Sequence, residues 1–279
     1  MSALNLQVES VDELAKIANE VRIDILNMVH KAQSGHIGGA YSAAEIVTTL
    51  YFNEMKNLDP SDPRKPNRDR FVLSKGHACP VWYSCLSKLG YFDRENLDHL
   101  RQLNSMLQGH PDMKSTPGID ITTGSLGHGC ASATGMALEG RLTGDGRRVY
   151  SVLGDGEINE GVVWETAMAA GKYKLDNLVF IVDKNNLQMD GTSDQIMPLL
   201  SVEDKFESFG WNVVSIDGHD ISQVMKAFEA ARNYKGKPTC IVASTIKGKG
   251  VSFMENVRNW HGKAPSDDEY HEALAELTA

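Results

Sequence analysis

The sequence predicts an α/β fold, in which a mostly parallel sheet is covered by helices on both faces. The first observation is that short apolar, β-branched runs alternate with helical stretches through the second half of the chain. The second is that these runs are continuously apolar, which is typical of parallel strands buried on both faces. Such sheets bind ligands outside the carboxyl ends of their strands, so functional side chains are expected at that edge.

The first part of the chain is expected to form helices. Ser10-Val-Asp-Glu13 is a capping box, and the apolar stripe after it has the 3/4 spacing of a helix that ends at Gly35. Ser42-Ala-Ala-Glu45 repeats the capping box and predicts a second helix running to about Asn53. The stretch 58–70 contains three prolines and is expected to be an irregular surface loop.

The second half of the chain supplies the sheet and the helices that cover it. The predicted strands are 149–153, 178–182, 211–216 and 239–243. The predicted helices are 160–173, 202–209, 221–234 and 267–277. Strands and helices therefore alternate, as in repeated βαβ units.

The composition is that of an acidic globular protein. The 28 Lys and Arg and 37 Asp and Glu give a net charge of −9, which argues against nucleic acid as the main partner because phosphate binding relies on a basic face. No run is apolar and long enough to predict a membrane span. Residues 1–10 have neither the basic nor the apolar region of an export signal, so a cytoplasmic protein with reduced cysteines is expected.

A Gly-Asp-Gly motif follows one predicted strand directly. Gly154-Asp-Gly156 comes after 149–153, and Asn185 comes after 178–182, about one βαβ unit further along. The two side chains are therefore expected at the carboxyl ends of neighbouring strands, facing one crevice. A carboxylate, an amide oxygen and a nearby backbone carbonyl are the hard ligands that Mg²⁺ on a diphosphate prefers. The glycines permit close approach, and the following helix N-terminus favours anions.

The same three residues can also form a simple turn, and the chain contains a second copy for comparison. Gly144-Asp-Gly146 precedes a predicted strand and has no partner Asn at the corresponding distance. We interpret this copy as a turn, and the copy at 154–156 as a metal and diphosphate site.

Histidines follow glycines far more often than the composition predicts. The five that do so are His36, His77, His110, His128 and His219. Imidazole in a glycine-bounded loop can donate to phosphate or hydroxyl oxygens, and no pair has zinc-site spacing. Structural roles are expected for His30, His99 and His271, on helical stretches, and for His219, in a turn after a strand.

Together these motifs resemble the N-terminal, diphosphate-binding half of a transketolase, from about Leu14 to Ala275. Six motifs occur in the order of that family: Ser34-Gly-His36, Asp69 to Ala78, Gly109-His-Pro111, Thr122 to Gly129, Gly154-Asp-Gly156 with Asn185, and His261 to Pro265. The resemblance implies a thiamine diphosphate-binding fold. It also implies one domain over 1–279, with the pyrimidine-binding and C-terminal domains on a partner chain.

The resemblance further implies thiamine diphosphate and Mg²⁺ as cofactors, with Ca²⁺ or Mn²⁺ as substitutes for the metal. The implied metal ligands are Asp155, Asn185 and the carbonyl of Leu187. The implied cofactor contacts are His77, Gly156 and His261 at the diphosphate, and Gly124, Ser125 and Leu126 along the aminopyrimidine. The implied catalytic residues facing the sugar are His36, His110 and His261. Glu160 matches a family carboxylate of the cofactor site that lies at the subunit interface. Arg101 matches a family arginine near the substrate channel.

The implied function is that of the N-terminal subunit of a split transketolase. Such an enzyme transfers a two-carbon ketol unit from a ketose or ketose phosphate to an aldose or aldose phosphate, in the pentose phosphate pathway. The family's activating glutamate lies in the absent domain, so activity is expected only with a partner, most simply in a heterotetramer with two copies of each chain. The alternatives are a subunit of a 1-deoxyxylulose-phosphate synthase-like or sulfosugar-specific enzyme, and a non-catalytic cofactor-binding or regulatory half.

Overall fold

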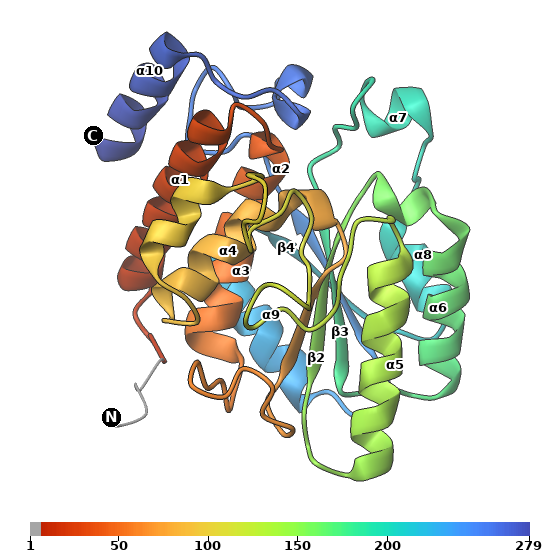
Figure 1. Cartoon of the computed structure of the whole chain (residues 1–279). Helices are drawn as coiled ribbons and strands as arrows, with labels where there is room; N and C mark the ends of the chain where they lie inside the picture. Colours follow the sequence, from red (N-terminus) through yellow and green to blue (C-terminus); the bar gives the residue numbers. More distant parts are fainter. Residues whose placement is uncertain (1–6) are drawn as a thin grey trace.

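The computed structural model describes residues 7–279 and contains a five-stranded sheet with the strand order β1-β2-β3-β5-β4 (Figure 1). The strands are β1 (Arg70–Leu73), β2 (Val149–Gly154), β3 (Leu178–Lys184), β4 (Asn212–Asp217) and β5 (Thr239–Ser244). Every neighbouring pair is parallel, which confirms the predicted fold class. Residues 1–6 carry part of the segment used to predict the lack of an export signal, and they lie outside the described residues.

Helices cover both faces of the sheet (Figure 1). One face carries α1 (Val11–Ala32), α2 (Ile37–Ser42), α3 (Ala44–Thr49), α4 (Cys79–Lys88) and α9 (Ile221–Asn233). The other carries α5 (His128–Thr143), α6 (Gly161–Lys172) and α8 (Val202–Ser208). Farther out are α7 (Ser193–Ile196) and α10 (Asp267–Thr278), and α10 packs on α1. The short helical turns are η1 (Leu50–Glu54), η2 (Gly76–Ala78), η3 (Arg94–His99), η4 (Glu157–Asn159) and η5 (Arg258–His261).

The sheet divides the hydrophobic core into two layers, because successive strand side chains point to opposite faces. Phe71, Tyr150 and Ile181 belong to the layer under α1, α3, α4 and α9. Val72 and Phe180 belong to the layer under α5, α6 and α8. Burial on both faces explains why these strands are continuously apolar in the sequence. Within residues 7–279, no helix combines the length and apolar character needed to cross a membrane.

The predicted alternation of strands and helices in the second half is confirmed to within about two residues at each boundary. Strand β1 and helices α2, α4, α5 and α7 were not predicted. Strand β1 has only four residues and directly follows the proline-containing loop. Nearly all side chains of helix α4 are buried, so its sequence has no polar face that would show the helical period. Helix α5 is rich in Gly, Ala, Ser and Thr, and this composition gives no clear apolar stripe.

The predicted end of the first helix at Gly35 is wrong. The side chain of Ser10 does cap α1, by accepting a hydrogen bond from the backbone N–H of Glu13. At the other end α1 finishes at Ala32, and the chain turns at Gln33, which has a φ of 47°. Gly35 is needed for packing instead, because a Cβ there would lie 2.7 Å from Cγ2 of Val29.

The predicted capping box at Ser42 is also wrong. Ser42 is the last residue of α2, and its buried hydroxyl donates to the carboxylate of Asp183 at 2.6 Å and not to a helix N-terminus. Glu45 instead contacts Arg22 at 2.6 Å and His219 at 2.9 Å. Both side chains of the motif are thus engaged by distant buried partners. The predicted helix to about Asn53 is present as α3 followed by the π-helical turn η1.

Candidate active site

A cavity of about 360 Å³ opens at the carboxyl ends of the strands. Most of the predicted site residues line it: His36, His77, His110, Gly124, Leu126, Asp155, Gly156, Asn185, Leu187 and His261. They come from segments far apart in the sequence, so the fold brings the separate motifs together. Ser125, Glu160 and Arg101 do not line the cavity. Ser125 and Glu160 are exposed, and Arg101 lies behind His36.

Asp155 and Asn185 follow neighbouring strands, as predicted. Strand β2 pairs with β3, and Gly154 is directly opposite Asp183. The carboxylate of Asp155 accepts hydrogen bonds from the backbone N–H groups of Gly156 and Asn186. Asn186 has a φ of 58°, a left-handed turn that reverses the chain so that Leu187 faces back to the cavity.

The carboxyl group of Asp155 is buried close to a second carboxylate. Burial and the nearby Asp183 carboxylate raise the pKa of Asp155 to about 6. A bound divalent cation would favour the ionised form of Asp155, so the carboxylate, the amide oxygen of Asn185 and the carbonyl of Leu187 fit a hard metal ion. The Leu187 carbonyl accepts a hydrogen bond from Nζ of Lys247 at 2.6 Å, so an ammonium group already lies at this oxygen.

Two buried lysines form the floor of the cavity, and sequence reasoning did not identify either as a site residue. Lys75 forms an ion pair with the fully buried Asp183 and donates to the carbonyl of Gly39 at 2.7 Å. Burial lowers the pKa of Lys247 to about 8. Lys247 could have been identified from its position in the sequence, because it comes three residues after the carboxyl end of β5, where ligand-facing side chains are expected.

Three imidazole rings meet at one wall of the cavity. The ring of His36 lies 5.0 Å from that of His77 and 5.4 Å from that of His261, between centroids. Burial, with additional repulsion from nearby cations, lowers the pKa of His36 and of His261 to about 4 and that of His77 well below its usual value. All three rings are therefore neutral at pH 7 and can each offer one N–H group.

His110 comes from an irregular loop between η3 and α5 and lines the same cavity. Its ring packs against Gly124, where a Cβ would approach Cδ2 of His110 to 3.2 Å. Burial and Arg101 lower the pKa of His110 as well. Gly124 has a φ of 153°, so a side chain there would be strained as well as crowded.

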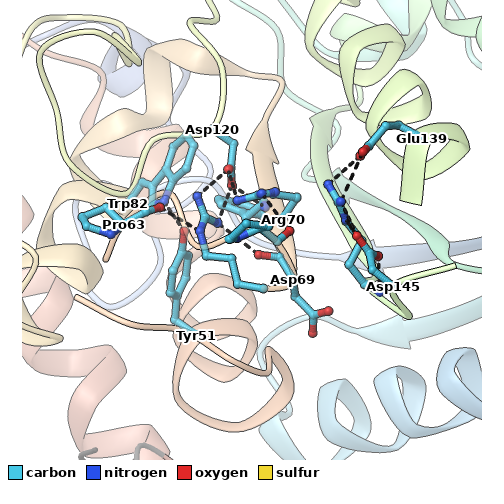
Figure 2. A network of polar contacts seen from close by, with 12 residues as sticks. Tyr51, Pro63, Asp69, Arg70, Trp82, Asp120, Glu139 and Asp145 are labelled. Atoms are coloured by element: carbon cyan, nitrogen blue, oxygen red, sulfur yellow. Dashed lines mark hydrogen bonds and ion pairs between the residues drawn. The ribbon is translucent and has the colours of Figure 1, made fainter. Parts of the chain in front are cut away.

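The loop that carries Gly124 and Leu126 is fixed along β1. The buried carboxylate of Asp120 accepts hydrogen bonds from Arg68 at 2.6 and 3.0 Å and from the backbone N–H of Phe71 at 3.1 Å. It also pairs with Arg70 at 3.3 Å (Figure 2). Thr123 donates to the carbonyl of Leu73 at 2.9 Å. These contacts begin at one end of β1 and finish at the other, and they hold the loop at the cavity.

Glu157 joins that loop to the Gly-Asp-Gly segment. Its buried carboxylate accepts hydrogen bonds from the hydroxyl of Ser74 and from the backbone N–H groups of Gly127 at 2.8 Å and Gly154 at 3.0 Å. Burial raises the pKa of Glu157. Sequence reasoning did not single out this residue, because its partners lie in segments that only the tertiary structure brings together.

The second Gly-Asp-Gly copy is a turn, as predicted. Asp145 accepts hydrogen bonds from the backbone N–H of Arg147 at 3.1 Å and from its Nε at 2.7 Å. The turn precedes β2, so it lies at the opposite end of the strand from Asp155, where Asp145 and Glu139 both contact Arg147 (Figure 2). Strand position therefore distinguishes the two copies.

Of the histidines expected to be structural, His30 and His219 contact distant parts of the protein, whereas His99 contacts the nearby Gln102 and His271 is exposed. Nε2 of His30 lies 2.9 Å from the carboxylate of Asp267 at the start of α10. His219 is largely buried and bridges Glu45 and the backbone N–H of Ile246, at 2.9 and 2.8 Å. His128 begins α5, and its Nδ1 is 3.2 Å from the hydroxyl of Ser125, so its contacts are local.

The family model that describes the thiamine diphosphate-binding domain of transketolase matches residues 14–278. The chain belongs to the transketolase family. It is 44% identical over 265 residues to the 6-deoxy-6-sulfo-D-fructose transketolase subunit of Clostridium sp. (strain MSTE9), covering 95% of this chain and 96% of that protein. It is 40% identical over 273 residues to an apulose-4-phosphate transketolase subunit of Phocaeicola vulgatus, covering 98% and 95%.

Solved transketolase structures share this fold over part of their length. The structure from Campylobacter jejuni superposes with a TM-score of 0.90 at 34% identity, and covers 96% of this chain but 43% of that one. For the Leishmania mexicana enzyme the TM-score is 0.90 at 32% identity, with 95% and 41% covered. This transketolase-family chain thus spans about two fifths of these enzymes but nearly the whole of the two subunit relatives.

Proposed function

We propose that the chain is the cofactor-binding subunit of a two-chain transketolase, which transfers a two-carbon ketol unit from a ketose or ketose phosphate to an aldose or aldose phosphate. The observation that carries this proposal is a single cavity that combines a hard oxygen ligand set with four histidines whose pKa values are lowered. When bound, thiamine diphosphate supplies the carbanion chemistry that lets the carbon–carbon bond beside a ketose carbonyl be broken and re-formed.

We assign the Gly-Asp-Gly corner to the diphosphate and its magnesium ion. Asp155, Asn185 and the carbonyl of Leu187 would hold the metal, which Ca²⁺ or Mn²⁺ could replace. Gly156 and His77 would contact the diphosphate, because both line the cavity beside the metal ligands. Lys247 would exchange its hydrogen bond to Leu187 for a contact with the metal-bound diphosphate, and its positive charge favours that anion.

We assign three of the four cavity histidines to the sugar. His36, His110 and His261 would donate N–H groups to sugar hydroxyls and to the oxygen on which negative charge develops, and His261 would also reach the diphosphate. Neutral imidazoles suit this work, because each presents a directed N–H group without needing a carboxylate partner. Gly124, Ser125 and Leu126 would lie along the aminopyrimidine, since Gly124 and Leu126 line the same cavity as the histidines.

The partner would be a chain with the pyrimidine-binding and C-terminal domains, leaving residues 1–279 as one diphosphate-binding domain. Coverage of only 41–43% of full-length transketolases supports this arrangement, as does the word subunit in the names of the two full-coverage relatives. Glu160, exposed at the start of α6, would lie at the subunit interface and couple paired sites in a cytoplasmic heterotetramer.

The names of the relatives support a proposal about the class of sugar that the donor belongs to. Two relatives are named for 6-deoxy-6-sulfo-D-fructose and apulose-4-phosphate, and a transketolase structure from Pichia stipitis is described with bound sedoheptulose-7-phosphate. We propose a ketose with a terminal anionic group as the donor. Comparing fructose 6-phosphate with 6-deoxy-6-sulfofructose separates a role in the pentose phosphate pathway from one in sulfosugar metabolism, the second of which the 44% identical relative favours.

Calorimetric titration of Mg²⁺ and thiamine diphosphate tests the cofactor assignment. Asp155→Ala should abolish metal-dependent binding, and Asn185→Ala should weaken it strongly, because each removes an oxygen ligand. The matched control is Asp145→Ala, which alters the second Gly-Asp-Gly copy at the other end of β2 and should bind as the wild type does. Equal losses for the Asp145 and Asp155 variants would refute the assignment.

A further inference from the structure

Arg101 lies one layer behind the cavity and contacts it only through His36. Its Nη1 donates to the hydroxyl of Ser34 at 3.1 Å, and its Nη2 is 3.2 Å from Nδ1 of His36. The backbone of Arg101 has a φ of 62°, a left-handed conformation that turns the side chain inward after η3. The guanidinium lies over Gly109, where a Cβ would come within 2.7 Å of Cζ. The positive φ of Arg101 and the lack of a side chain at Gly109 therefore both permit this placement.

The direction of the contact between Arg101 and His36 is fixed by chemistry. A guanidinium stays protonated in proteins and has only donors, so Nη2–H must donate and Nδ1 of His36 must accept. A neutral imidazole carries one proton, which is then on Nε2. Nε2 is on the far side of the ring from Arg101, towards Gly262, where a Cβ would be 3.9 Å away. The N–H group of His36 therefore lies on the side of the ring away from Arg101, in a residue that lines the cavity.

We propose that Arg101 is a positioning residue that holds His36 in the Nε2–H tautomer, so that the ring presents a hydrogen-bond donor to the substrate. The claim that His36 donates to the substrate rests on the proposed function. The claim that His36 is the Nε2–H tautomer rests only on its contact with Arg101. His261 has a parallel arrangement, because Nζ of Lys247 lies 3.1 Å from its Nδ1. Two cations, Arg101 behind the cavity and Lys247 at its floor, thus orient two rings in the same sense.

The charges around His36 support a neutral ring with this tautomer. Arg101, His110 and Lys247 are the charged or titratable groups that act on it besides burial, and each lowers its pKa. The rings of His77 and His261 face it from η2 and η5. No carboxylate is among the groups that shift its pKa within the described chain, so nothing there competes for a proton on Nδ1.

His219 provides an internal contrast within the same chain. Its Nε2 accepts a hydrogen bond from the backbone N–H of Ile246 at 2.8 Å, and its Nδ1 faces the carboxylate of Glu45 at 2.9 Å. A backbone N–H can only donate, so the neutral ring of His219 must carry its proton on Nδ1. His36 and His219 are therefore expected to be opposite tautomers.

Long-range ¹H–¹⁵N NMR of the ¹⁵N-histidine-labelled chain at pH 7 tests the tautomer, because protonated and unprotonated ring nitrogens have well-separated shifts. We expect Nε2 to be protonated in His36 and Nδ1 in His219. Arg101→Lys should keep the His36 pattern, since an ammonium also only donates. Arg101→Glu should place a proton on Nδ1, because a carboxylate accepts. A wild-type His36 protonated on Nδ1, or an unchanged His36 pattern in Arg101→Glu, would overturn the proposal.

Assays of the chain reconstituted with its partner test the consequence for turnover. Arg101→Glu should lower kcat about 10- to 150-fold, the loss expected for one charge-assisted hydrogen bond, while thiamine diphosphate affinity and melting temperature stay near wild type. Arg101→Lys should recover most of kcat, and Arg64→Gln, an exposed arginine in a loop, should behave as wild type. If NMR shows the expected tautomers but neither the wild type nor any variant transfers a ketol unit, the proposed function is refuted and the tautomer assignment remains. Loss of kcat in the Lys and Glu variants alike would contradict a positioning role.

Discussion

Neutral, buried histidines make the cavity sensitive to acid at the level of single residues. The pKa of His36 is lowered to about 4, so below pH 6.5 the unfolded chain binds a proton that the folded chain does not. The free energy of unfolding should therefore fall as the pH falls from 6.5 towards 4. The slope from one such group is at most about 1.4 kcal/mol per pH unit, and less for His36 because its ring is partly exposed.

His36→Gln should flatten this acid slope, as measured by urea unfolding of the cofactor-free chain between pH 5 and pH 7. Asp155 contributes with the opposite sign, because its pKa is raised, so the comparison is between variant and wild type at each pH. His271→Gln, on the exposed side of α10, serves as the control and should leave the slope unchanged. An identical slope in His36→Gln and wild type would show that His36 is not buried in its neutral form.

The histidines should also separate by function. His77→Ala should mainly weaken thiamine diphosphate binding, whereas His36→Ala and His110→Ala should leave that affinity largely intact and lower turnover. Each loss corresponds to about 1.5–3 kcal/mol, or roughly 10- to 150-fold. Calorimetry for the cofactor and steady-state kinetics of the reconstituted enzyme measure the two effects. A His36→Ala variant with weakened cofactor binding and normal turnover would contradict its substrate-facing role.

At the scale of elements, the loop from Asp120 to Leu126 depends on the ion pairs that Asp120 forms with Arg68 and Arg70. Asp120 and Arg68 are both almost fully buried, so Asp120→Asn leaves the guanidinium without its counter-charge. We expect this change to cost about 3–5 kcal/mol of the free energy of unfolding and to reduce cofactor affinity, because the loop carries Gly124. Asp145→Asn changes a more exposed pair on Arg147 and should cost about 1 kcal/mol or less in the same urea titration.

The secondary-structure elements also show which features could be predicted from the sequence and which could not. Asp155 and Asn185 could be placed because a residue that directly follows a buried strand is fixed at the carboxyl edge by chain direction alone. The partners of Ser42 and Glu45 could not be predicted, because buried contacts with Asp183 and Arg22 outcompete a local helix cap. The contact of Arg101 with His36 depends on a positive φ and on the open space above Gly109, which no local pattern specifies.

At the scale of the whole molecule, exposed apolar side chains are concentrated on the segment 189–200, which contains α7. We call this group the α7 patch, and its side chains are Met189 (62% exposed), Ile196 (45%), Met197 (56%) and Leu200 (80%). Met189 also lines the cavity, so a chain that covers the patch would close the site as well. Exposed apolar groups gathered in this way are typical of interaction sites.

We expect the purified chain to have essentially no ketol transferase activity, even with excess Mg²⁺ and thiamine diphosphate, and to gain it when the partner chain is added. Met197→Glu with Leu200→Glu should prevent both assembly, measured by light scattering, and the gain of activity. Leu142→Glu is the matched control, because Leu142 is 79% exposed at the far end of α5, away from the cavity. Strong activity of this chain alone, free of host enzyme, would refute the two-chain proposal.

The packing of α10 on α1 has a consequence for how the chain is made. Asn19 donates to the carbonyl of Leu277 at 2.7 Å, and the hydroxyl of Tyr270 donates to Asn27 at 2.9 Å. Of the described helices, α1 is the first to leave the ribosome and α10 the last. The face of α1 that α10 covers therefore stays exposed while the strands of the sheet are being translated. We therefore expect the contacts between α1 and α10 to be among the last to form when the chain is synthesised.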